Sequence, residues 1–153
     1  MKNWKESLKE QLPLLGHRNW IVITDMAYPL QSNPGIVTLY APEAYQDVVR
    51  DVNQLVQEAP HVRPNIYLDE EQKKMSEGLC EGWDAYRKNL ADALQLEDVK
   101  YILHEDLIAR LDEVSKVFNV VIIKTPLTIP YSSVFFELNC GYWGDANEKE
   151  LRK

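Results

Sequence analysis

Four polar side chains stand at the ends of apolar runs that are typical of β-strands, and they could do acid-base chemistry. His17 lies just before the run WIVIT, and Asp25 follows it directly. His104 ends a later apolar run, and Tyr131 opens the last one. Open α/β sheets tend to bind ligands beyond the carboxyl ends of their strands. Asp25, His104 and Tyr131 could therefore converge, although they are far apart in the sequence.

The chemistry of these residue types suits proton exchange and hydrogen bonding to a small polar molecule. An ordinary histidine has a pKa of about 6.5, so it can give or take a proton at neutral pH. His17 stands at the opposite end of its strand from Asp25, however, and a strand of about five to eight residues spans roughly 17 to 27 Å. The side chains of His17 and Asp25 in one chain therefore cannot both contact the same small ligand. A bent segment or a site between subunits would be needed.

Each of these residues also has a purely structural interpretation, and the sequence leaves both open. His17 follows a glycine and can hydrogen-bond a turn. Asp25 can form a turn through local amides, which is the commoner use of aspartate in loops. His104 can cap the helix that follows it, and Tyr131 can be a packed ring with a satisfied hydroxyl.

The elements that must position these residues follow from apolar periodicity and from turn-forming residues. Helices are expected over residues 2–15, where Gly16 would end the helix in a left-handed conformation, and over 43–58, 72–94 and 105–118. Strands are expected over 20–24, 36–41, 99–103, 120–124 and 131–138, with a short strand within 61–71. The tail from about residue 144 is expected to fray. This order predicts a single α/β layered domain over residues 1–153, with a largely parallel sheet flanked by helices.

Composition narrows the class of partner. The 153 residues carry a formal net charge of −7, which argues against nucleic acid or an anionic membrane as the main partner. No apolar run approaches the roughly 20 residues of a membrane span, and the charged start does not resemble a secretory signal, so we expect a cytoplasmic protein. Phosphate loops, dinucleotide fingerprints, nucleophilic serine motifs and metal-ligand spacings are absent from the sequence. We therefore expect neither a cofactor nor a metal.

The segment GHRNWIVITDMAYP resembles the RbsD/FucU family, the ribose pyranases and fucose mutarotases. The matching positions are Gly16, His17, Asp25 and Pro29. The likeness continues in VKYILHEDLIARL and in PYSSVFFEL, so that it extends in order from about residue 12 to residue 141. No single motif is very specific, but the ordered set is.

The resemblance implies a sugar site between the subunits of a ring-like homo-oligomer, commonly a pentamer or a decamer. His17 would be the catalytic proton donor and acceptor, while Asp25, His104 and Tyr131 would bind sugar hydroxyls, together with Ser133 where the family has asparagine. The reaction would be interconversion of the anomers, or of the pyranose and furanose forms, of a monosaccharide.

Three positions depart from the family pattern at this expected site. Asn19 replaces an acid two residues after the histidine, Met26 replaces a small residue that follows the aspartate, and Ser133 replaces the asparagine. Two hypotheses follow: a mutarotase or pyranase with altered specificity, or a non-catalytic sugar-binding or assembly protein on the same scaffold. The middle segment, residues 60–98, could add a lid or an interface.

Overall fold

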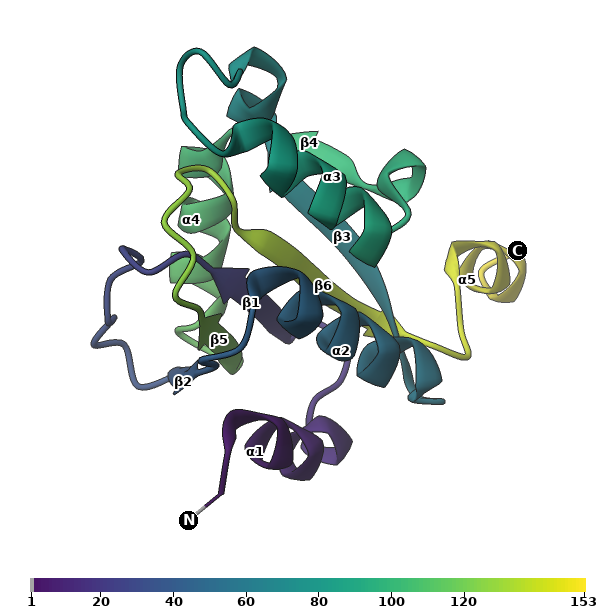
Figure 1. Ribbon diagram of the computed structural model, residues 1–153. Coiled ribbons are helices and arrows are strands. Elements are labelled where there is room, and N and C mark those ends of the chain that lie inside the picture. The colour runs from purple at the N-terminus through teal and green to yellow at the C-terminus, as the bar shows by residue number, and fades with distance from the viewer. Residues whose placement is uncertain (1) are drawn as a thin grey trace.

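The sheet is built around β1 (Trp20–Thr24), whose five residues are all buried. The computed structural model describes residues 2–153 and contains one six-stranded sheet in the order β2-β5-β1-β6-β3-β4 (Figure 1). The other strands are β2 (Ile36–Tyr40), β3 (Val62–Asp69), β4 (Lys100–Ile102), β5 (Val120–Lys124) and β6 (Val134–Cys140). The α-helices are α1 (Trp4–Gln11), α2 (Tyr45–Glu58), α3 (Trp83–Ala93), α4 (His104–Val114) and α5 (Asp145–Leu151), with short 3-10 helices at Leu12–Leu14, Glu70–Lys74 and Leu96–Asp98.

The sheet is largely parallel, as the order of elements predicts. Strand β5 pairs in parallel with β1 and β2, and β3 pairs in parallel with β4. Only β6, between β1 and β3, runs antiparallel to both of its neighbours. The chain between β5 and β6, residues 125–133, contains no helix that could return it to the far edge of the sheet. As a result, β6 starts at the edge where the parallel strands end.

Helices cover both faces of this sheet, because successive side chains of a strand point to opposite sides. Ile21 and Ile23 pack in one core cluster with residues of α1, α2 and α3. Trp20 and Val22 pack in a second cluster with Leu107 of α4. Figure 1 accordingly shows α4 on the other side of the sheet from α2 and α3. The architecture is a single α/β domain of three layers.

The connection from β1 to β2 crosses the sheet without a helix. Residues 25–35 lead from the carboxyl end of β1 back to the level at which β1 and β5 begin, because β1 and β2 both run parallel to β5. Tyr28 in this crossover loop is buried in the core cluster beneath α4. Asn33 donates a 2.8 Å hydrogen bond to the Ser115 hydroxyl, and a Cβ added at Gly35 would collide with the Ser115 carbonyl oxygen. The loop is therefore held tightly against the end of α4.

Two expectations near the N-terminus and in the middle of the chain are wrong. The left-handed residue after the first helix is Arg18, with φ 82°, and not Gly16. Residues 72–94 are not one helix: the 3-10 helix Glu70–Lys74 is followed by turns, and α3 begins only after Gly82, whose φ is 91°. The positive φ at Gly82 interrupts any helix that would continue through it.

Two other segments are more ordered than expected. The short strand expected within residues 61–71 is the eight-residue β3, which pairs with both β4 and β6. The charged tail, expected to fray, forms α5, and Figure 1 shows this helix standing apart from the sheet. In α5 the Asn147 side chain accepts a hydrogen bond from the Gly144 backbone N–H. Such a bond satisfies a backbone donor at a helix start.

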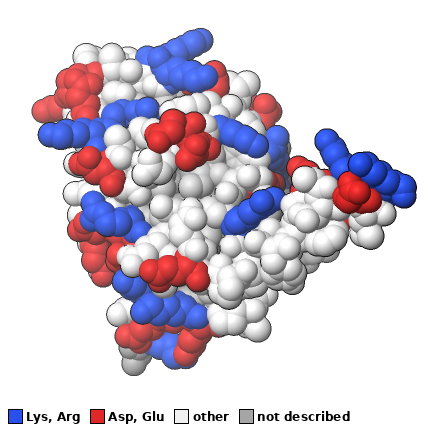
Figure 2. Space-filling view, turned by 90° about the vertical axis from the view of Figure 1, so that its right-hand side faces the viewer, with Lys and Arg blue, Asp and Glu red and all other residues white. Residues whose placement is uncertain are grey.

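The surface shows no sign of segregated charge on the face that Figure 2 presents. Lysine and arginine side chains are interspersed there with aspartate and glutamate. Within residues 2–153, no helix combines the length and the apolar character that a bilayer crossing requires.

Candidate functional site

The structure brings four of the five expected site residues into one pocket at the carboxyl edge of the sheet. Parallel strands end at this edge, and β6 starts there because its direction is reversed. Side chains that follow β1 and β4 therefore meet side chains that precede β6. Six polar or aromatic residues that line the pocket are Asp25, Tyr28, Gln31, His104, Tyr131 and Ser133.

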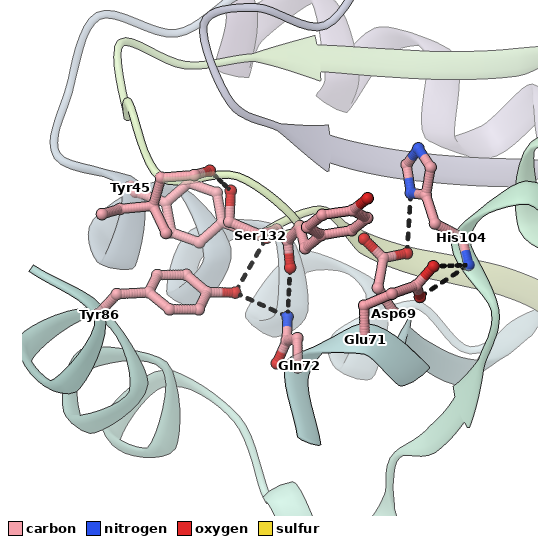
Figure 3. A network of polar contacts seen from close by, with 9 residues as sticks. Tyr45, Asp69, Glu71, Gln72, Tyr86, His104 and Ser132 are labelled. Carbon is pink, nitrogen blue, oxygen red and sulfur yellow. Dashed lines mark hydrogen bonds and ion pairs between the residues drawn. The ribbon is translucent and has the colours of Figure 1, made fainter. Parts of the chain in front are cut away.

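His104 is the first residue of α4 and is held at both its backbone and its side chain (Figure 3). Its backbone N–H donates to the Glu71 carboxylate, with distances of 3.0 and 3.4 Å to the two oxygens. Its ring Nδ1 lies 3.0 Å from Oδ1 of Asp69. The helix N-cap position, Leu103, supplies no side-chain bond. Glu71 thus takes the place of a local cap, and its negative charge suits the helix N-terminus.

The carboxylates near His104 have unusual surroundings. Asp69 is fully buried, and its Oδ2 has no hydrogen-bond partner in the described chain. Burial raises the pKa of Asp69, and the hydrogen bond from Nδ1 to that carboxylate raises the pKa of His104. Burial also raises the pKa of Asp25, although the nearby His104 opposes this shift. Asp25 and His104, which line the pocket, and Asp69, which is buried behind His104, therefore all favour protonation more than their ordinary counterparts do.

Tyr131 presents its ring to the pocket from a strained backbone. Its φ of 54° lies in the left-handed region, which costs a non-glycine residue about 1–3 kcal/mol. The side chain is 42% exposed, and its ring lies edge-on to His104 with the centroids 5.7 Å apart. A strained residue at a pocket is a candidate for function, because its surroundings must hold it in place.

A buried network of hydrogen bonds holds this turn (Figure 3). The Gln72 side-chain amide donates to the Tyr131 carbonyl at 2.8 Å. The hydroxyls of Tyr45 and Tyr86 both donate to the carbonyl of Ser132, the bond from Tyr86 being 3.0 Å long. Burial raises the pKa of both tyrosines, so both hydroxyls keep their protons at neutral pH. The network links α2, α3 and the 3-10 helix to the residue that faces the pocket.

His17 does not lie in this pocket. It is exposed at the amino end of β1, where it lines a separate hollow with Arg63, Lys100 and Glu148. Asn19 shapes the turn beside it: its side-chain oxygen accepts from the Gly16 N–H at 2.7 Å, and its Nδ2 donates to the Asn119 carbonyl at 3.0 Å. The amide at position 19 therefore holds the turn.

The other two departures from the family pattern differ in their relation to the pocket. Met26 is 43% exposed and is not among the residues that line the pocket, so it does not crowd the site. Ser133 is only 3% exposed and does line the pocket.

Sequence reasoning missed Asp69, Glu71 and Gln72, all of which come from the middle segment. The available signal was the run IYLDEE, in which acids follow an apolar stretch just as Asp25 follows β1. The sequence predicts only a short strand in this segment and does not place its end beside the pocket. Among residues 2–153, no group of three or more His, Cys, Asp or Glu side chains is arranged to hold a metal ion.

Solved structures with the same fold include proteins from three bacteria. Bacillus subtilis RbsD, solved with D-ribose, is 21% identical at a TM-score of 0.61, covering 91% of this chain and 98% of that one. The fucose mutarotase of Streptococcus pneumoniae, solved with L-fucose, is 18% identical at a TM-score of 0.53, covering 87% and 91%. FucU from Bifidobacterium longum is 12% identical at a TM-score of 0.57, covering 88% and 94%.

Identities this low establish a shared fold only. No curated protein matches the chain. The sequence profile of the RbsD / FucU transport protein family, however, matches residues 4–141, which is most of the 153 residues. The chain therefore belongs to the RbsD/FucU family.

Proposed function

We propose that the protein is a monosaccharide mutarotase or pyranase, which interconverts the anomers or the ring forms of a sugar. The observation that carries the proposal is the convergence of Asp25, His104, Tyr131 and Ser133 in one pocket of a chain that belongs to this family. The related structures solved with D-ribose and with L-fucose support a monosaccharide as the substrate class.

The pocket residues suit the chemistry of a cyclic hemiacetal. Opening the ring removes the proton of the anomeric hydroxyl and protonates the ring oxygen, and closing it on the other face reverses both transfers. Histidine side chains perform such transfers near neutral pH. Asp25 can accept hydrogen bonds from sugar hydroxyls, and the exposed ring of Tyr131 can pack against C–H faces. The proposal includes no cofactor.

His17 enters the proposal as a residue supplied by a second copy of the chain. Within one chain it stands at the far end of β1, and five strand residues span roughly 17 Å. We therefore propose a homo-oligomer, a pentamer or a decamer, in which the exposed His17 of one copy completes the pocket of another and serves as its proton donor and acceptor. The exposure of His17 supports this arrangement.

Saturation-transfer NMR of anomeric protons tests the activity directly. A panel of ribose, fucose, galactose, glucose and rhamnose is compared with and without the folded protein. Faster exchange for one sugar identifies both the activity and the substrate. Saturable binding without faster exchange would show that the protein binds sugar without catalysing its interconversion. No effect on any sugar would contradict the proposal.

A further inference from the structure

Asp69 and His104 meet because their strands are neighbours in the sheet. Asp69 is the last residue of β3 and pairs in register with Ile102 of β4, two residues before His104. The two side chains are joined by the 3.0 Å contact between Oδ1 and Nδ1. A neutral histidine carries one ring proton, so a carboxylate at Nδ1 selects the form with Nδ1 protonated and Nε2 free. Figure 3 shows Nε2 on the side of the ring away from Asp69.

The surroundings of Asp69 argue against a role in stability alone. A fully buried carboxylate oxygen without a partner costs free energy, and such groups in native proteins require an explanation. A serine or an asparagine at position 69 could hydrogen-bond the ring without placing a charge in the interior. Within residues 2–153, the one partner of the Asp69 side chain is the His104 ring, which lines the pocket.

His104 itself is held from several sides but is not closed off. Glu71 binds its backbone N–H, and the rings of Tyr131 and Phe135 lie edge-on to it with centroids 5.7 and 6.5 Å away. Its side chain is nevertheless 31% exposed. A ring that is fixed in orientation and open at one nitrogen is suited to proton transfer.

From these observations we propose that Asp69 is a positioning residue, which keeps Nε2 of His104 free to act as a catalytic base on the sugar. This rests on the proposed function and deepens it. Nε2 takes the proton of the anomeric hydroxyl, whose O–H electron pair forms the carbonyl while the ring C–O bond breaks. The released pair goes to the ring oxygen, which takes a proton from the protonated His17 that a second copy supplies, so each histidine handles one of the two protons. Ring closure reverses these steps.

The pH dependence of this role follows from the charges that face His104. Asp69 comes from β3, Glu71 from the 3-10 helix that follows it, and Asp25 from the end of β1, and all three raise the pKa of His104. The hydrogen bond to Asp69 has the largest effect. Removing the Asp69 charge should therefore move the ionisation of His104 to lower pH.

The test compares the native protein with Asp69→Asn, using Asp92→Asn on the exposed face of α3 as a control that loses the same charge. In metal sites, loss of an outer group that orients a histidine ligand typically costs about 10-fold to 100-fold in activity, and we take the same range here. We expect Asp69→Asn to lower kcat by that amount and to move the His104 limb of the pH–rate profile to lower pH. Asp92→Asn should change neither.

A second measurement needs no variant. In ¹⁵N NMR of the native protein above the pKa of His104, Nδ1 should carry the proton and Nε2 should not. The opposite tautomer would overturn the inference, as would unchanged kcat and an unchanged pH profile in Asp69→Asn while the native protein accelerates sugar exchange. If the native protein accelerates no sugar, the proposed function fails and the role of His104 fails with it.

Discussion

The Gln72 side chain holds the strained backbone of Tyr131 through a 2.8 Å hydrogen bond from its amide to the Tyr131 carbonyl. The amide is itself oriented, because its oxygen accepts a 2.7 Å hydrogen bond from Arg87. Gln72 is buried and does not line the pocket. A residue outside the pocket lining thus fixes the position of one that lines the pocket.

Gln72→Leu should therefore weaken sugar binding and the fold together. The variant leaves the Tyr131 carbonyl without its Gln72 partner, and a buried group left unsatisfied costs about 1–3 kcal/mol. It also removes one hydrogen bond of the Arg87 guanidinium, which keeps its bond to the Tyr101 hydroxyl. We expect a lower free energy of unfolding in urea and a higher KM for the sugar. Gln57→Leu on the exposed face of α2 is the matched control. Equal KM values for the native protein and Gln72→Leu would show that the turn holds without this bond.

His17→Ala should lower turnover while the fold remains stable. The side chain is exposed, and surface substitutions usually change stability by within about 0.5 kcal/mol. Loss of a general acid-base group typically costs about 10² to 10⁴ in rate. Sugar exchange measured by NMR, with the mass of the assembly measured by light scattering, checks both points. A variant with native turnover would remove His17 from the reaction, and one that loses its assembly would give His17 a structural role.

Stability should fall with rising pH as His104 loses its proton. The folded pKa is raised above the unfolded value, chiefly by the hydrogen bond to Asp69, so the folded state binds more protons than the unfolded state. The stabilisation is fully present below about pH 6.5, the ordinary value for histidine, and is lost as the pH rises through the folded pKa. Tm measured across this window should fall more in the native protein than in Asp69→Asn. Parallel curves would contradict the coupling.

Gly35→Ala should destabilise the protein, because the new Cβ would collide with the backbone carbonyl of Ser115. Overpacking of this kind typically costs about 1–3 kcal/mol. Gly78→Ala is the control, since the nearest atom to its Cβ would be the Ser76 hydroxyl oxygen at 4.0 Å. Urea unfolding should separate the two variants. Similar stability of both would mean that the crossover loop moves away from α4 at little cost.

The sequence predicted the sheet-forming segments well, because their signals are local. The apolar run of residues 20–24 is β1 without any change of bounds, and the spacing of Val48, Val52 and Val56 correctly indicates the buried face of α2. Prediction was poorest over residues 60–98. There Gly82 with its positive φ divides the expected helix, and β3 is longer than its mixed composition suggested.

For the candidate site, the sequence by itself determined which strand ends carry Asp25, His104 and Tyr131, and it predicted from strand length that His17 lies apart from Asp25. Only the tertiary structure decided that Asp69 pairs with His104, 35 positions away, and that Gln72 holds Tyr131. Those contacts depend on strand order and on the reversed direction of β6, which place β3 beside β4 and bring the start of β6 to the same edge. Strand order results from packing across the whole sheet, so no local run of residues encodes it.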